Sequence, residues 1–350
     1  MVICARGVEA HAASTIARTA TRFTSASYTP LRVLLDDFLR REIDLGSFPG
    51  AAYAIGSYDA IEYENALGHA VAVPLRIPAT LDTLYDCASI TKPLITAQLV
   101  LRLGLLEETF HGFPVRRLLT HTSGLRAWMP LYAYDDPLRA ILDEGPEYEP
   151  GTRVVYSDLN FILLWMMLGR EKYVELAHEQ IGLGDDAMFR PPALLRPRIA
   201  ATEWGQRFEA KLASRYDLPG ARQGLIWGET HDGNAHHLGG GTSGNAGLFA
   251  TARGVFRIAS AFVRSEWGEL AARNYTEGLN ENRGLGWLIG VNGYGHTGFT
   301  GTSVEIDPER RRIFVLLTNR VHPCAAPIGM KRIRAEFRLG SDLETQLNDG

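Results

Sequence analysis

The sequence predicts an α+β fold, in which an antiparallel sheet flanked by terminal helices receives an inserted all-helical domain. Two observations support this prediction. Strand-like segments cluster near both ends of the 350-residue chain, whereas the pattern from about residue 89 to residue 270 is mainly helical with long loops. The middle of the chain is therefore expected to be an insertion between the two halves of one sheet.

The N-terminal part of the predicted sheet domain begins with a helix over residues 31–43. Its apolar side chains recur at helical spacing, namely at Leu31, Leu34, Leu35, Phe38 and Leu39. Residues 50–56 are typical of a buried strand. Residues 62–67 indicate a second strand, after a turn near Tyr58-Asp59.

The C-terminal part adds a predicted hairpin and a closing helix. Residues 298–306 and 312–318 are expected to be its two strands, because the segment Asp307-Pro308-Glu309-Arg310 between them has turn chemistry. Residues 328–337 are typical of an amphipathic helix.

We therefore expect three regions in the chain. Residues 26–88 and 271–345 together form an α/β domain, and residues 89–270 form the mainly helical domain. Residues 1–25 are rich in Ser, Thr and Ala, contain arginines and lack the apolar core of a secretory signal. A transit peptide, a mis-assigned start and a disordered tail all explain this segment. We expect a cytoplasmic protein with a disordered or leader-like tail.

Bulk composition excludes several classes of function. The apolar content is 45% and the charged content 22%, which is ordinary for a soluble globular protein. A net charge of −4 gives no reason to expect nucleic acid as a partner, because binding phosphates needs a basic face. The sequence has no run of eighteen apolar residues, so no transmembrane segment is expected. The oligomeric state cannot be predicted.

The three cysteines are widely spaced along the chain. Cys4, Cys87 and Cys324 match neither a disulfide framework nor a metal-binding spacing, and we expect reduced thiols. Cys87 lies two residues before Ser89. We interpret it as a small packing residue rather than as an alternative nucleophile.

The spacing of Ser89 and Lys92 predicts a nucleophile. Residues three apart share a helix face, so the hydroxyl and the ammonium lie side by side. A serine hydroxyl needs a neighbour that takes its proton, and an amine is one such neighbour. The alternative is a helix-capping serine followed by a lysine that faces solvent.

Two further motifs follow in order, Tyr156-Ser157-Asp158 and His296-Thr297-Gly298. Together with the Ser89 motif they resemble the serine β-lactamase and penicillin-binding-protein superfamily. The branch suggested contains class C β-lactamases, D,D-peptidases, D-aminopeptidases and related carboxylesterases. Further similar segments are 118–125, 156–164, 231–235, 244–249, 284–287 and 316–320. The resemblance runs from about residue 30 to residue 338.

The resemblance implies a β-lactamase/transpeptidase-like fold with the active site in the cleft between its two domains. It implies that Ser89 forms an acyl-enzyme and that Lys92 assists its deprotonation. It also implies an oxyanion hole made by the backbone N–H groups of Ser89 and Phe299. Thr297 and Gly298 are expected on the edge strand that lines the cleft.

Tyr156 is the expected general base of acylation and the acid that returns a proton to the leaving group. The usual pKa of a phenol is near 10, so this role requires a lowered pKa, which Lys92 is expected to provide. How proton transfer divides between Lys92 and Tyr156 is left open by the sequence.

Two positions depart from the pattern of many relatives. Asp158 stands where many have asparagine, and we hypothesise that its charge holds Lys92 protonated and disfavours substrates with a carboxylate. His296 stands where β-lactamases have lysine, and a mostly neutral imidazole is a weaker anion clamp.

A metal site is the alternative for one histidine-rich loop. His231, Asp232, His236 and His237 cluster within seven residues, but no second pair of ligands with helix spacing is evident. We therefore expect no metal and no cofactor. His121 is expected to be a structural turn residue.

These features predict a metal-free serine hydrolase that acts on small ester or amide substrates through an acyl-serine intermediate. A carboxylesterase or a D-amino-acid peptidase is preferred over a β-lactamase. A catalytically silent relative that binds peptidoglycan fragments or a protein partner remains the alternative from another class.

Overall fold

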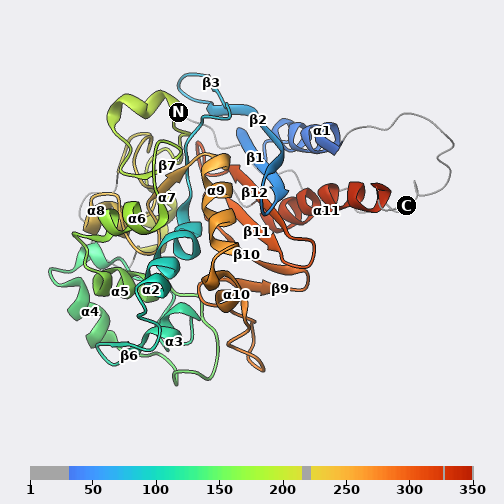
Figure 1. The fold of residues 1–350 in the computed structure, drawn as a ribbon. Helices are drawn as coiled ribbons and strands as arrows, with labels where there is room; N and C mark the ends of the chain where they lie inside the picture. The colour runs from blue at the N-terminus through green and yellow to red at the C-terminus, as the bar shows by residue number, and fades with distance from the viewer. Residues whose placement is uncertain (1–30, 215–221, 326–327, 349–350) are drawn as a thin grey trace.

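A seven-stranded antiparallel sheet joins the two ends of the chain (Figure 1). The computed structural model describes residues 31–214, 222–325 and 328–348. Its strand order is β3-β2-β1-β12-β11-β10-β9. The strands are β1 (Gly50–Ser57), β2 (Ile61–Val71), β3 (Ile77–Pro78), β9 (Leu288–Gly290), β10 (Gly293–Thr297), β11 (Ser303–Asp307) and β12 (Arg312–Thr318). The antiparallel pairing of β1 with β12 joins the N-terminal strands to the C-terminal strands in one sheet.

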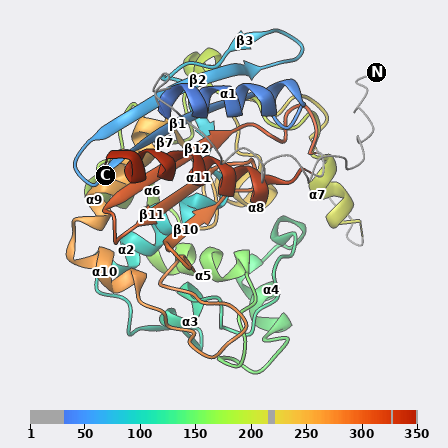
Figure 2. The same ribbon diagram turned by 90° about the vertical axis from the view of Figure 1, so that its right-hand side faces the viewer.

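Helices α1 (Leu31–Asp44) and α11 (Met330–Asn348) pack together on one face of this sheet (Figure 2). Their apolar stripes bury Leu35, Leu39 and Ile333 against Tyr53 and Phe314 of β1 and β12. Burial of these stripes explains why the periodicity of both segments predicts helices. The predicted helix at 31–43 and the strands at 50–56 and 62–67 are confirmed, and the closing helix begins at Met330.

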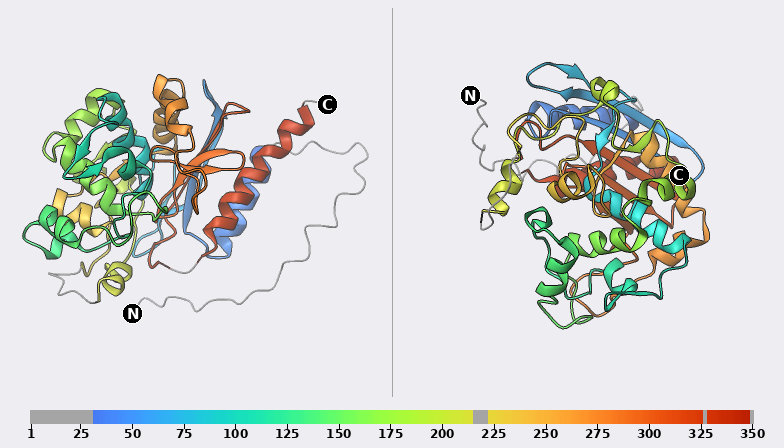
Figure 3. Two further views of the ribbon diagram at one scale, coloured as in Figure 1. Left: turned by 90° about the horizontal axis from the view of Figure 1, so that it is seen from below. Right: turned by 90° about the vertical axis from the view of Figure 1, so that its left-hand side faces the viewer.

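The remaining helices lie on the other side of the sheet (Figure 3). Helix α9 (Ala252–Val263) packs directly on β1 and β12, and α10 (Glu266–Ala272) packs on α9. The others are α2 (Gln98–Arg102), α3 (Val115–Leu119), α4 (Pro137–Glu144), α5 (Asp158–Leu168), α6 (Tyr173–Ile181), α7 (Arg207–Leu212) and α8 (Gly233–Gly239).

Short strands are interspersed among these helices. A small sheet pairs β4 (Tyr85–Asp86), β8 (Leu248–Ala250) and β7 (Ala187–Phe189), and a hairpin pairs β5 (Thr109–Phe110) with β6 (Phe113–Pro114). Because α9 packs on the large sheet, part of the 89–270 stretch lies against the strands from both ends of the chain. The division at residues 89 and 270 stays a prediction.

Helix α5 is the apolar centre of this helical layer. From Phe161 to Leu168 it is hydrophobic all round, which is typical of a helix buried among others, and it buries Phe161 and Trp165 completely or nearly so. The loop at Gly244 crosses it closely, because a Cβ on Gly244 would lie 2.0 Å from the carbonyl oxygen of Phe161. This contact sets the position of Asn245, the next residue, beside the N-terminal end of α5.

The predicted strand at 298–306 is wrong at its start. Residues 298–302 form a tight turn between β10 and β11, closed by a hydrogen bond from the Gly298 N–H to the Thr302 carbonyl at 2.8 Å. The edge strand is β9, not the strand that ends at Thr297. However, β9 pairs with β10 only as far as Gly295, so the last two residues of β10 have no strand on that side.

One expectation about cysteine is also wrong. Cys324 is disulfide-bonded, whereas Cys87 is free and buried. The predicted tail at residues 1–25 lies outside the described residues. Within the part of the chain that the structure describes, no helix is both long and apolar enough to cross a membrane.

Candidate active site

Ser89 lies in a 3₁₀ turn (Ala88–Ile90) that connects β4 to a buried helical segment. Ala88 has a φ of 46°, a left-handed conformation that costs a non-glycine residue about 1–2 kcal/mol. Its N–H donates to the Asp86 carboxylate at 2.9 Å, which holds the turn in place. Such strain is typical of sites where a side chain must point in one direction.

Lys92 begins a π-helix (Lys92–Ala97) directly after this turn, and its side chain is fully buried. Its Nζ lies 2.9 Å from the Ser89 Oγ, 3.2 Å from the Asn245 carbonyl oxygen and 2.7 Å from the Asp158 Oδ1. An ammonium has three hydrogens, and these are three acceptors. The alternative of a lysine that faces solvent is therefore wrong.

The charge of Lys92 is stabilised by its neighbours. Burial alone lowers the pKa of Lys92, but the nearby Asp158 and Tyr156 outweigh burial and raise it above its usual value. Lys92 is therefore an ammonium at neutral pH. As an ammonium, it donates to the Ser89 oxygen and cannot take the proton of that hydroxyl.

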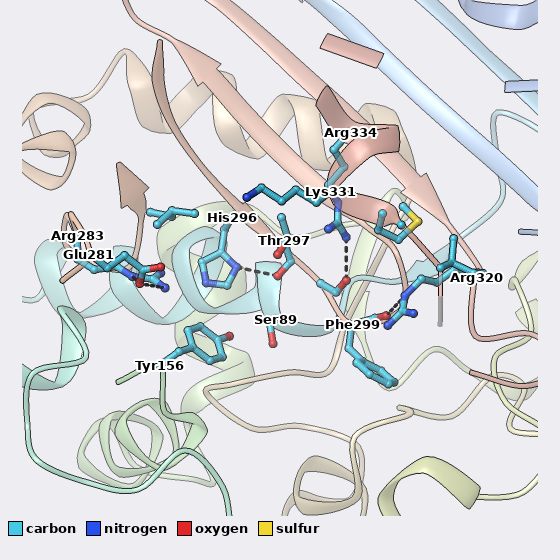
Figure 4. Close-up of a pocket in the computed structure, with 15 residues that line it drawn as sticks. Ser89, Tyr156, Glu281, Arg283, His296, Thr297, Phe299, Arg320, Lys331 and Arg334 are labelled. Atoms are coloured by element: carbon cyan, nitrogen blue, oxygen red, sulfur yellow. Dashed lines mark hydrogen bonds and ion pairs between the residues drawn. The ribbon is translucent and has the colours of Figure 1, made fainter. Parts of the chain in front are cut away.

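Tyr156 directly precedes the N-cap of α5 and faces Ser89 across the pocket (Figure 4). The Lys92 Nζ lies 4.9 Å from the centre of its ring. The expected lowering of its pKa is wrong. Burial raises the pKa of Tyr156, and the charge of Asp158 adds to that rise, while Lys92 opposes both. Tyr156 is therefore a neutral phenol at rest.

The Tyr156 hydroxyl is buried and makes no hydrogen bond of good geometry within the described residues. Lys92 and Ser89 are nevertheless close enough to favour its ionised form. A hydroxyl without a fixed partner is free to turn towards a group that enters the pocket.

His296 and Thr297 form the end of β10 that has no strand beside it. The His296 Nδ1 donates to the Thr297 carbonyl oxygen at 2.9 Å, which leaves Nε2 as a buried acceptor without a partner among the described residues. Burial, with the charges of Lys92 and Arg283, lowers the pKa of His296 well below its usual value. His296 is therefore neutral, as its residue type indicates.

Gly298 brings the end of β10 against the Ser89 turn. A Cβ at this position would lie 2.1 Å from the Thr302 Oγ1 and 2.7 Å from the Cys87 carbonyl oxygen. The next residue, Phe299, lines the same cavity as Ser89, and its N–H has no partner within the described ranges. This N–H is available to a ligand oxygen placed near Ser89.

A cavity of about 590 Å³ contains Ser89, Tyr156 and residues 296–299 (Figure 4). Four basic side chains also line it, namely Arg283, Arg320, Lys331 and Arg334. Its one acidic lining residue, Glu281, forms an ion pair with Arg283 at 2.6 Å. The expectation that His296 and Asp158 make a weak site for anions did not consider these basic residues, and it stays a prediction.

Sequence reasoning missed these basic residues for physical reasons. Arg334 reaches the cavity from α11 and belongs to no short motif. Arg320 lies just after β12 and ends the segment 316–320, which was its available signal. Arg283 adjoins the segment 284–287, so that segment was the available signal. The Asn245 carbonyl is a backbone atom, which no residue type reveals.

The histidine-rich loop is used structurally. The His231 Nε2 lies 3.1 Å from the Glu203 Oε2, and the Asp232 carboxylate accepts from the Ala235 N–H at the start of α8. Across the residues that the structure describes, no group of three or more His, Cys, Asp or Glu side chains is placed to hold a metal ion. Burial raises the pKa of Cys87 well above its usual value, which disfavours it as a nucleophile.

Comparison with known proteins identifies the family. The profile of the Beta-lactamase family matches residues 35–337. The chain belongs to the β-lactamase family. Members of this family are of the serine hydrolase type. The predicted α+β fold, with its antiparallel sheet and helices, is the β-lactamase/transpeptidase-like fold, and that prediction is confirmed.

The chain is similar to one curated relative in sequence and to two solved structures in fold. A putative D-alanyl-D-alanine carboxypeptidase of Escherichia coli O157:H7 is 28% identical, over 84% of this chain and 83% of that protein. The solved structure of EstCE1, a hydrolase with promiscuous acyltransferase activity, has a TM-score of 0.66 at 18% identity and covers 89% of this chain and 98% of its own. A class C β-lactamase has a TM-score of 0.63 at 16% identity, over 89% and 96%.

The ion pair between Lys92 and Asp158 predicts a pH-dependent effect on stability. The pKa of Lys92 is raised in the folded protein, so the pair contributes stability below about pH 10.5 and loses it as the pH rises through the folded value. Asp158→Asn is therefore expected to lower the free energy of unfolding by about 2 kcal/mol near pH 8. This difference should shrink above pH 10.5.

Denaturant unfolding of both proteins from about pH 8 to about pH 11 measures that difference. The titration of the other lysines affects the unfolding free energy of both proteins equally, so it cancels in the difference. The exposed residue Asp59 is the matched control, and Asp59→Asn should change stability by less than about 0.5 kcal/mol. A difference for Asp158→Asn that is absent near pH 8, or that grows with pH, contradicts the account.

Proposed function

We propose that this protein hydrolyses small ester or amide substrates through an acyl-serine intermediate, as a carboxylesterase or D-amino-acid peptidase does. The observation that supports the proposal is the set of contacts made by the buried Lys92 Nζ with the Ser89 Oγ and the Asp158 carboxylate, at the base of a pocket that Tyr156 also lines. A structural lysine has no need of a serine hydroxyl that faces a cavity.

The proton inventory assigns the roles. Ser89 accepts a hydrogen bond from the Lys92 ammonium, so its own proton points elsewhere. Tyr156 is the remaining group near enough to receive that proton. Because Tyr156 is a phenol at rest, it must release its own proton as it takes the one from Ser89.

The leaving group is the acceptor that balances this transfer. As the Ser89 Oγ forms a bond to the acyl carbon, its proton passes to the Tyr156 oxygen. The Tyr156 proton passes to the departing oxygen or nitrogen as its bond to the acyl carbon breaks. No free phenolate is formed, which suits a hydroxyl whose pKa is raised. Water then reverses these transfers, restores the Ser89 hydroxyl and releases the acid.

Lys92 and two backbone N–H groups are proposed to stabilise the negative charge that develops during acyl transfer. The ammonium opposes the build-up of negative charge on the Ser89 oxygen during attack. The N–H groups of Ser89 and Phe299 are proposed to receive the carbonyl oxygen of the substrate. His296 and Thr297 are proposed to line the substrate along the free side of β10, where a peptide backbone has room to pair.

The four basic side chains that line the pocket, here called its basic wall, favour a substrate with a negative charge. Arg334 donates to the carbonyl oxygens of Gly298 and Thr302, and its Nε is buried without a partner among the described residues. A free carboxylate on the leaving group fits this environment. D-amino-acid peptides with a free C-terminus combine such a carboxylate with an amide, and the similar Escherichia coli protein is named a putative D-alanyl-D-alanine carboxypeptidase.

A β-lactamase is the second candidate, since β-lactam antibiotics also have a carboxylate that the same wall accepts. A panel of short-chain nitrophenyl esters, D-alanyl amides and nitrocefin separates these activities by their relative kcat/KM values. If the protein is instead a catalytically silent binding protein of the same family, no substrate in the panel is turned over.

Ser89→Ala is expected to abolish covalent labelling by a fluorophosphonate and to lower kcat/KM for a nitrophenyl ester by about 10³-fold or more. The reason is that no other group in the pocket takes over the acyl transfer. Peptide mapping of the labelled wild-type protein should place the label on Ser89. Ser57→Ala, at the end of β1, is the control and should retain wild-type labelling. Labelling that survives in Ser89→Ala excludes the proposed nucleophile.

Arg334→Gln is expected to raise KM by about 10-fold or more for a D-alanyl substrate with a free carboxylate, because a charge-assisted hydrogen bond is lost. The KM for a neutral nitrophenyl ester should change by less than about 2-fold. Arg332→Gln, two residues away and paired with Glu42 and Glu336, is the matched control. Equal changes for both substrates would argue against a carboxylate site.

A further inference from the structure

We propose that His121 is the positioning residue for Tyr156, and that it acts by holding the peptide groups on both sides of this tyrosine. The inference rests on the proposed function, in which Tyr156 exchanges protons with Ser89. It assigns to His121 a role beyond that of a turn residue. Contacts made by its backbone, by its ring and by the residues that orient the ring support this role.

His121 accepts two hydrogen bonds, one from the residue on each side of Tyr156. The Val155 N–H donates to the His121 carbonyl oxygen at 3.0 Å, and the Ser157 N–H donates to the His121 Nδ1 at 3.1 Å. The residues immediately before and after Tyr156 are thus fixed by one residue, which lies 34 and 36 positions before them in the sequence. Rotation of the Tyr156 backbone breaks one bond or the other.

The backbone conformation of His121 makes both contacts possible. Its φ is 57°, a left-handed geometry that costs a residue with a side chain about 1–2 kcal/mol. The carbonyl and the ring of the same residue then face the same segment. His121 is fully buried, so the ring cannot leave this position without disrupting the core.

Hydrogen bonds among neighbouring side chains determine which nitrogen of the His121 ring is the hydrogen-bond acceptor. The Ser123 Oγ donates to the Asn160 Oδ1 at 2.5 Å, so the Asn160 amide presents its NH₂ group to the His121 Nδ1 at 3.2 Å. With donors from both Ser157 and Asn160, Nδ1 must be unprotonated. The single ring proton is therefore on Nε2.

The ring also packs against Tyr156 itself. Their centroids lie 4.6 Å apart with a 39° tilt, and the ring of Phe161 supports His121 from another side at 5.3 Å. Burial and the charges of Arg283 and Lys92 lower the pKa of His121 well below its usual value. His121 thus places a neutral surface against the phenol and adds no charge that competes with Lys92.

The test compares two substitutions that keep the left-handed backbone. Glycine at position 121 allows the turn but removes the ring and its acceptor. Asparagine tolerates the same φ and restores a side-chain acceptor. We expect His121→Gly to lower kcat for a nitrophenyl ester by about 100-fold with KM changed less than about 3-fold, because misplacement of a catalytic group acts on kcat. His121→Asn should recover about 10-fold of that loss and stay about 10-fold below the wild-type kcat.

His111 provides the matched control. It is a second histidine with a positive φ, of 47°, but it is exposed and lies outside the cavity. His111→Gly and His111→Asn should keep wild-type kcat. A second readout is the pH profile of kcat, in which the limb that reports Tyr156 should shift in His121→Gly and remain in place in the His111 variants.

The outcomes separate this inference from the proposed function. Wild-type protein that is neither labelled at Ser89 nor active disproves the proposed function. Labelled, active wild-type protein with unchanged kcat in His121→Gly and His121→Asn disproves only the role of His121. If His121→Gly does not fold, His121→Asn decides: a folded variant with kcat lowered about 10-fold and KM retained supports the role, and wild-type kcat overturns it.

Discussion

The buried ammonium of Lys92 is the constraint on which the rest of the site depends. A buried ammonium destabilises the fold unless each of its N–H groups has a hydrogen-bond acceptor and an opposite charge lies nearby. The serine hydroxyl, a backbone carbonyl and the Asp158 carboxylate provide both. In consequence, Ser89 receives a hydrogen bond and must direct its own proton towards Tyr156.

The fold meets this constraint by bringing distant segments together. The turn before the π-helix presents Ser89, the N-terminal end of α5 presents Asp158, and the loop packed on α5 through Gly244 presents the Asn245 carbonyl. The sheet contributes the opposite wall, because β9 is too short to cover the end of β10. One cavity therefore combines the hydroxyl groups of Ser89 and Tyr156 with the basic wall.

Periodicity predicted the terminal helices and the strands β1 and β12, since each buries a continuous apolar face. It failed at residues 298–302, where a turn follows β10, because local pattern does not reveal the contact between Gly298 and the Cys87 carbonyl. Short motifs likewise indicated Ser89 and Lys92. They did not indicate Arg334 or the raised pKa of Tyr156, both of which depend on tertiary packing and burial.

The protonation state of Lys92 is the most direct test of this account. NMR of protein labelled with ¹⁵N at lysine, with Lys92→Arg to assign the signal, follows the Nζ as the pH is raised. The account predicts an ammonium that shows no titration from about pH 6 to about pH 10. A Lys92 amine that loses its proton near neutral pH would contradict the account, because it could then take the proton of Ser89 itself.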